Sequence, residues 1–470
     1  MQYTRIFRKN SHVTRTQASS RATSALLSFT ARNVRSYEDE VNLSLLGTRL
    51  SDEGVARDLA SAGSSSPVSV LPVAGVFGAN ASGKSTLLRA MSDMRVVVLN
   101  SFRRGDQETK LFRHPFLLHG KGADRPSSFG VDLILDGVHW QYGFEINDRQ
   151  VLDEYAYHYP KGRQALVFGR RRDDRDPSFG PGFRSSGSTL ARFVRKNALL
   201  LSVAGAVADS SDDDRQGVVA VLGPLFDWFG RNLGLMESAN REARITHTAK
   251  RLETSKAEPA IVALLQAADL GITKIERLPV DPEVAERMER ALRILNGLEE
   301  ESGQGQEARF LPNDLVRLHH TGAGGPVAID PEHESRGTLV WVGMLGPMLD
   351  SIRKGSVLLV DELDGSLHPH LVQQFIRLFQ NRKTNPHCAQ LIFNAHDPTV
   401  LGDSGRRPLG RDQIWFTEKD AHGATALYSM ADFRPKGDEA LGRRYLQGRY
   451  GGVPVLNAAE FDRAADVTGS

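Results

Sequence analysis

The feature that most constrains this chain is a glycine-containing loop of eight residues between an apolar run and a helical pattern. The loop reads Gly78-Ala79-Asn80-Ala81-Ser82-Gly83-Lys84-Ser85 and fits the phosphate-binding pattern GxxxxGK[ST]. Residues 68–77 before it are mostly apolar and predict a strand, and residues 86–91 after it predict a helix. This order of strand, loop and helix predicts an α/β fold with a phosphate-binding loop at the end of a strand.

The residue types in this loop suit an anion such as a nucleotide phosphate. The glycines let successive backbone N–H groups face the anion, and the start of the following helix adds its dipole. Lys84 is expected to reach the β- and γ-phosphates, and the Ser85 hydroxyl to bind Mg²⁺, so we predict ATP and Mg²⁺ as cofactors. The predicted nucleotide-binding residues of the loop are Gly78, Ala79, Asn80, Ala81, Ser82, Gly83, Lys84, Ser85 and Thr86.

A second strand ends in two acidic residues. Residues 357–360 are all apolar, which predicts a buried central strand with Asp361 at its carboxyl end beside the phosphate loop. We predict that Asp361 and Ser85 bind the metal ion and that Glu362 polarises the attacking water. An ordinary surface turn that carries two acids is the alternative. Lys84 and Asp361 lie far apart in the sequence, which indicates a large insertion between the two halves of the site.

These motifs resemble those of ABC-type ATPases related to the SMC and RecF proteins. The segment Glu334-Ser335-Arg336-Gly337-Thr338 is similar to their degenerate signature motif. The resemblance implies that Ser335 and Gly337 touch the γ-phosphate bound in the opposite subunit; an exposed helix cap is the alternative. The segment 392–397 resembles the switch strand, which implies that His396 contacts the γ-phosphate, whereas a lone histidine is otherwise more often structural.

The resemblance narrows to the ABC-like AAA ATPases of phage defence and abortive infection, namely the AbiL and RloA type and the AriA subunit of PARIS. Its further segments are 33–37, 114–116, 142–146, 361–364, 411–416 and 445–451. It implies a sensor that controls a partner effector, often a TOPRIM-type nuclease, in response to a trigger encoded by the phage. It also implies self-association, as an ATP-sandwich dimer or as a hexamer.

Composition and hydrophobic periodicity along the chain predict its division around this site. Residues 1–24 are expected to be a disordered basic tail, and residues 25–236 an N-terminal ATPase lobe with the phosphate loop and antiparallel strands. Residues 237–310 are expected to be a helical insertion, and 311–470 a C-terminal lobe with the signature, the acidic pair and the switch histidine. Within the N-terminal lobe, the alternating segments 131–135, 139–146 and 164–168 predict the antiparallel strands. The expected fold is an ABC-type P-loop ATPase head with an antiparallel β subdomain.

Composition excludes several other classes of protein. The single cysteine, Cys388, rules out an intramolecular disulfide and a Cys-cluster zinc site, and no apolar stretch is long enough to span a membrane. We therefore expect a cytoplasmic protein without a membrane partner. The formal net charge of +2 does not indicate DNA binding but leaves it open. A RecF- or SMC-like ATPase of DNA repair or chromosome maintenance is the alternative function, and it would favour long heptad arms or a concentrated basic face.

Overall fold

The computed structural model describes residues 24–103, 109–120, 122–172, 176–210, 217–252, 258–279, 314–402, 407–454 and 456–466. The tail predicted over residues 1–24 lies outside these ranges, apart from Ser24. Residues 280–310, the later part of the predicted helical insertion, also lie outside them.

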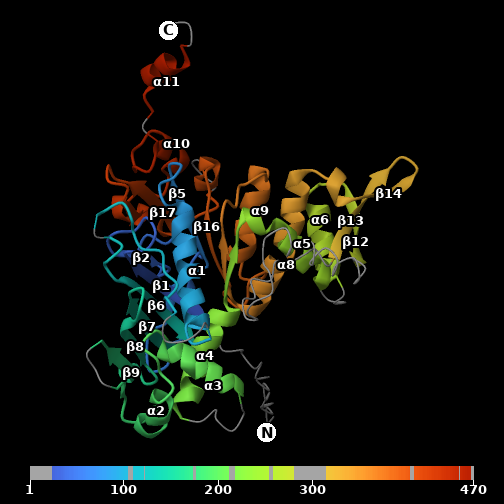
Figure 1. The fold of residues 1–470 in the computed structure, drawn as a ribbon. Helices are drawn as coiled ribbons and strands as arrows, with labels where there is room; N and C mark the ends of the chain where they lie inside the picture. The colour runs from blue at the N-terminus through green and yellow to red at the C-terminus, as the bar shows by residue number, and fades with distance from the viewer. Residues whose placement is uncertain are drawn as a thin grey trace, which may run out of the picture.

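A six-stranded sheet with a buried parallel core forms the centre of the molecule (Figure 1). Its order is β11-β15-β16-β5-β17-β18, and every neighbouring pair is parallel except β17 and β18. All residues of β5, β15 and β16 are buried, as expected for parallel strands that are covered on both faces. The strands are β5 (Val73–Gly78), β11 (Leu233–Met236), β15 (Val357–Val360), β16 (Gln390–Asn394), β17 (Ile414–Lys419) and β18 (Thr425–Ser429).

Helix α1 (Lys84–Asn100) lies between this sheet and a seven-stranded antiparallel sheet (Figure 1). Its apolar side chains, such as Leu88 and Met91, share one core with Phe29 and Tyr142 of the antiparallel sheet. The antiparallel order is β10-β9-β8-β7-β6-β1-β2, which confirms the predicted antiparallel β subdomain. The strands are β1 (Ala25–Arg32), β2 (Val41–Ser44), β6 (Ser127–Leu135), β7 (Val138–Ile146), β8 (Val151–His158), β9 (Ala165–Arg171) and β10 (Ser178–Phe179).

Shorter elements complete the N-terminal lobe. The strands β3 (Arg57–Leu59) and β4 (Val68–Val70) form a two-stranded sheet. Three helices, α2 (Arg184–Ala191), α3 (Leu200–Ser210) and α4 (Val218–Arg231), follow the antiparallel sheet in sequence. Helices α3 and α4 pack against α1 and extend its core.

The other face of the central sheet is covered by α8 (Arg336–Lys354) and α9 (Pro369–Gln380). Helix α5 (Arg241–Arg251) packs closely on α8, where the Thr248 hydroxyl donates to Val342 O at 2.9 Å and accepts from Gly346 N at 3.1 Å. The sheet therefore lies between α1 and the layer of α8 and α9 (Figure 1).

The described part of residues 237–310 is not wholly helical. It holds α5, α6 (Glu258–Ala267) and the strand β12 (Ile272–Pro279). Strand β12 pairs with β13 (Asp314–Gly322), which pairs with β14 (Gly325–Ile329), and the three form a separate antiparallel sheet. Within the predicted helical insertion, the described residues thus combine helices with a strand: Ile272 and Ile275 are buried, and β12 packs against α5, α6 and β13.

The C-terminal residues return to the central sheet. Helix α10 (Leu441–Leu446) packs on η3 (Pro398–Leu401), with Gly442 N donating to Gly402 O at 3.2 Å. Helix α11 (Ala458–Ala465) projects from the body at the upper end of Figure 1. The remaining short helices are η1 (Ser238–Asn240), η2 (Pro331–His333), η4 (Arg411–Gln413) and η5 (Met430–Phe433). None of the helices in the described ranges is both long and apolar enough to cross a membrane.

Candidate active site

The phosphate loop connects the end of β5 to the start of α1, as the sequence predicts. Gly83 directly precedes the helix with a φ of 109°, a conformation that L side chains rarely adopt. A Cβ atom at Gly83 would lie 2.6 Å from the Thr425 hydroxyl oxygen, so glycine is also required for space. Thr425 donates to Ser82 O at 3.0 Å and therefore holds the loop from the side of β18.

Lys84 lies within the loop and is only 4% exposed. Its ammonium group donates to Gly78 O at 2.8 Å and to Ala79 O at 2.9 Å. Burial lowers the pKa of Lys84, and the nearby carboxylates of Asp364, Asp361 and Glu362 oppose that shift. The acidic residues at the end of β15 are thus close enough to act on the phosphate-loop lysine.

The two predicted metal ligands, Ser85 and Asp361, meet at the side chain of Asn394. The Asn394 amide nitrogen lies 2.6 Å from Asp361 Oδ1 and 3.4 Å from Ser85 Oγ. Strand β16 brings Asn394 there because it lies between β15, which ends before Asp361, and β5, which ends before the phosphate loop. A hydroxyl and a carboxylate oxygen that both contact one amide nitrogen are oxygen ligands of the kind that a hard cation such as Mg²⁺ takes.

An arginine also reaches this acidic centre. Arg89, on α1, donates to Glu237 Oε1 at 2.8 Å, and its Nη2 lies 3.8 Å from Asp361 Oδ2. Neither Arg89 nor Asn394 was predicted as a site residue. The signal for Asn394 is that this polar residue ends an otherwise apolar strand. The signal for Arg89 is that it lies four residues after Ser85, which places both on one face of the helix.

Glu362 leaves the sheet through a sharp change of backbone direction. Its φ is 56°, in the left-handed region, and its side chain is exposed. The backbone N–H of Glu362 donates to Asn394 Oδ1 at 2.7 Å, which holds this strained residue in place. The side chain is therefore accessible to water at the carboxyl end of β15, as a general base requires.

His396 lies two residues beyond Asn394, and it is exposed. The backbone N–H groups of His396 and Asp397 donate to Asp364 Oδ2 at 2.8 Å and 2.7 Å. Asp364 therefore links the segment after Glu362 to the predicted switch histidine. Glu362 and His396 follow the carboxyl ends of the adjacent parallel strands β15 and β16. The phosphate loop follows the carboxyl end of the next strand, β5, so all three lie at the same end of the sheet.

Ser335 and Gly337 are positioned at the start of α8. The Ser335 hydroxyl caps the helix by accepting from Thr338 N at 3.1 Å, so the helix-cap interpretation of this serine is realised. Gly337 lies against the segment that follows Glu362, where a Cβ atom would approach Ser366 O to 2.7 Å. The Ser335 hydroxyl bonds to the backbone N–H and the hydroxyl of Thr338, within the first turn of its own helix.

The close approach at Gly337 predicts a loss of stability on substitution. In Gly337→Ala the new methyl group must displace the start of α8 or the Ser366 carbonyl, which is expected to lower the free energy of unfolding by about 1–3 kcal/mol. Chemical denaturation measures this change. The matched control is Gly223→Ala in α4, where a Cβ atom meets nothing within 4 Å and helix stability should rise. Equal stability of Gly337→Ala and wild type would contradict the packing described for Ser366.

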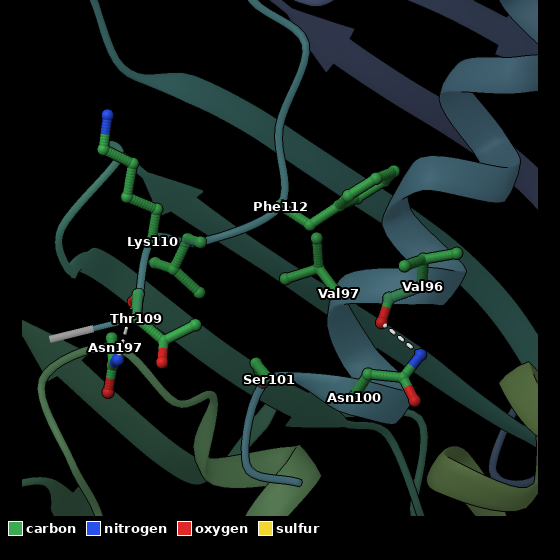
Figure 2. Close-up of a pocket in the computed structure, with 9 residues that line it drawn as sticks. Val96, Val97, Asn100, Ser101, Thr109, Lys110, Phe112 and Asn197 are labelled. Carbon is green, nitrogen blue, oxygen red and sulfur yellow. Dashed lines mark hydrogen bonds between the residues drawn. The ribbon is translucent and has the colours of Figure 1, made fainter. Parts of the chain in front are cut away.

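A separate small pocket lies at the opposite end of α1. Figure 2 shows its lining residues, which come from the end of α1, from the segment 109–112 and from Asn197. Because α1 begins at the phosphate loop and ends at Asn100, this pocket is a helix length away from Lys84 and is not part of the site.

The chain is distantly similar to many solved structures, among them the following three. An SMC head bound to the C-winged helix domain of ScpA is 10% identical, with 86% of this chain and 97% of that chain covered and a TM-score of 0.36. The SMC head domain from Thermotoga maritima is 12% identical, with 86% and 98% covered and a TM-score of 0.36. The recombination mediator RecF with ATP is 12% identical, with 88% and 100% covered and a TM-score of 0.34.

A comparison of the sequence with protein families identifies the family of this chain. No curated protein matches the chain. Residues 73–402 match a family described as "AAA domain, putative AbiEii toxin, Type IV TA system". The matched range contains the phosphate loop, Asp361, Glu362 and His396, and it spans more than half of the chain. The protein therefore belongs to this family of AAA domains.

Proposed function

We propose that this protein binds ATP with Mg²⁺ and hydrolyses it. The observation that carries the proposal is the convergence of Ser85, Asp361 and the Glu362 backbone on one buried amide, that of Asn394, beside the phosphate loop. Bound Mg²⁺ would neutralise charge on the phosphate oxygens. In this proposal Lys84 and the loop N–H groups bind the phosphates, Glu362 accepts the proton of the attacking water, and His396 contacts the γ-phosphate.

Phosphate release by the purified full-length chain tests this proposal. We expect ATP hydrolysis that requires Mg²⁺ and stops when EDTA is added. A parallel measurement with GTP establishes the preferred base. A pure, folded chain that neither binds nor hydrolyses ATP or GTP in the presence of Mg²⁺ would refute the proposal.

We further propose that the ATPase is a sensor and switch in anti-phage defence that controls a partner effector, such as a TOPRIM-type nuclease, after a phage-encoded trigger is detected. The family description, which names an AbiEii toxin, and the resemblance to AbiL, RloA and AriA support this role. The test is phage infection of cells that carry the gene with its chromosomal neighbours. Protection that is lost in the Lys84→Ala strain supports defence, whereas sensitivity to DNA damage without any change in phage growth favours the repair function.

We also propose that a complete ATP site needs two copies of the chain. Gly337 packs beside Ser366 and the Ser335 hydroxyl caps α8, both within their own chain, so a second copy is the expected source of signature residues at each phosphate loop. A mixture of two variants that are each inactive, Lys84→Ala and Ser335→Arg, should therefore regain part of the ATPase activity. Lys84→Ala lacks a phosphate-binding lysine and Ser335→Arg lacks a signature serine, but a mixed pair contains one site with both.

The readout is the ATPase rate after subunit exchange, which fluorescence transfer between labelled chains verifies. Ser335→Ala serves as the control for the lost helix cap, which alone costs about 1 kcal/mol. A mixture that exchanges subunits and stays as inactive as each parent contradicts the two-copy site. Full activity in a fraction that sizing shows to be monomeric contradicts it as well.

A further inference from the structure

We propose that Asn394 is a positioning residue that orients Asp361 and the backbone of Glu362 for binding of Mg²⁺ with the nucleotide. The inference rests on the proposed ATP site. Asn394 is the last residue of β16 and is 0% exposed. A buried amide is stable only when its polar atoms have hydrogen-bond partners. All three of its described side-chain contacts are to the phosphate loop helix or to the acidic pair.

The contacts determine which way the amide faces. Asn394 Oδ1 must be the atom that accepts from the Glu362 N–H at 2.7 Å, because an amide nitrogen cannot accept that bond. The amide nitrogen then faces Asp361 Oδ1 at 2.6 Å and Ser85 Oγ at 3.4 Å, and it donates to the carboxylate. The Asn394 side chain thus accepts a hydrogen bond from the backbone of Glu362 and donates one to the carboxylate of Asp361.

The backbone of Asn394 is held on both sides, so the amide cannot easily move away. Leu363 N donates to Asn394 O at 3.0 Å, and Ala395 N donates to Val76 O at 3.3 Å. The first bond ties Asn394 to the segment after Glu362, and the second ties its neighbour to β5 just before the phosphate loop. Asn394 therefore sets the spacing between the two halves of the site.

Replacing Asn394 removes one hydrogen bond from Asp361 and one from the left-handed Glu362. Asp361 is only 9% exposed, so its carboxylate depends on protein partners for its orientation. Groups that orient a metal-binding side chain in this way typically change metal affinity by about 10–100-fold when they are lost. Lys84 and the loop N–H groups do not contact Asn394 through any described bond, so binding of the phosphates without metal should not change.

The test is the binding of a fluorescent ATP analogue to the full-length chain at increasing Mg²⁺ concentration and, separately, in EDTA. For Asn394→Ala and Asn394→Leu we expect the half-saturating Mg²⁺ concentration to rise by about 10–100-fold, with unchanged affinity for the analogue in EDTA. Leucine has the same branched heavy-atom shape as asparagine, with a somewhat larger volume, but makes none of its hydrogen bonds. A purely space-filling role predicts wild-type behaviour for Asn394→Leu, which would overturn the proposal.

The control is Ile392→Val, which removes one methylene from the same face of β16 without touching a polar contact. If neither Asn394→Ala nor Asn394→Leu has a native circular dichroism spectrum, Asn394→Thr decides. Its hydroxyl can replace only one of the two bonds to the acids, so the Mg²⁺ requirement should still rise, and a requirement equal to wild type overturns the proposal. Wild-type protein that does not bind the analogue at all refutes the ATP site itself. Wild type that requires Mg²⁺ while the variants match it refutes only the role of Asn394.

Discussion

Lys84→Ala is expected to abolish ATP binding. The ammonium group is the buried positive charge of the phosphate loop, where a charge-assisted hydrogen bond to a phosphate is stronger than a neutral one. Its removal also deletes the bonds from Nζ to Gly78 O and Ala79 O, which hold the loop closed around the lysine. Titration with a fluorescent ATP analogue and Mg²⁺ measures the loss.

The control for this prediction is Lys383→Ala, because Lys383 is exposed in the turn after α9 and away from the loop. It should bind the analogue as wild type does. If Lys84→Ala retains wild-type affinity while its circular dichroism spectrum is native, the nucleotide does not bind at residues 78–86.

Glu362→Gln is expected to keep ATP binding and to lose turnover by at least about a hundredfold. Glutamine is nearly isosteric with glutamate but cannot accept the proton of the attacking water, and a positioned general base contributes roughly 10²–10⁴ in rate. The bond from the Glu362 backbone to Asn394 involves the main chain, so it survives this substitution. ATP should therefore remain trapped on the variant, and a filter-binding assay for unhydrolysed nucleotide detects it.

The matched control is Glu53→Gln, which changes an exposed glutamate in a loop of the N-terminal lobe and should leave turnover unchanged. Hydrolysis by Glu362→Gln near the wild-type rate would mean that another group is the base. Glu362 would then act only in the turn that follows β15.

The parts of the site that depend on local pattern were predictable from the sequence. The strand, loop and helix at 73–100 and the buried strand before Asp361 are short-range patterns that the structure contains. The strand predicted over residues 68–77 is shorter than expected, because residues 68–70 form β4 of a separate sheet and β5 begins at Val73. Helix α8 begins at Arg336, directly after the capping Ser335, because serine satisfies an N–H group at a helix start.

The residues that were missed depend on long-range pairing. Asn394 reaches Asp361 and Ser85 only because β16 is inserted between β15 and β5, and no local pattern states the order of strands in a sheet. Strand β8 was missed because Glu154 interrupts its apolar alternation. Burial raises the pKa of Glu154, while Arg170 and the N–H groups of Leu200 and Leu201 stabilise its charge.

The position of β5 has a consequence for how the protein is made. β5 pairs with β16 and β17, which are synthesised roughly 300 residues later, or about 15–60 s at ribosomal rates. The end of β5 is also close to the last part of the body, because a Cβ atom at Gly452 would lie 3.6 Å from the Gly78 Cα atom, and Tyr445 donates to Gly452 O. A nascent chain therefore exposes an incomplete phosphate loop for most of its translation. Prematurely terminated chains that lack β16 and β17 should therefore be unable to bind nucleotide.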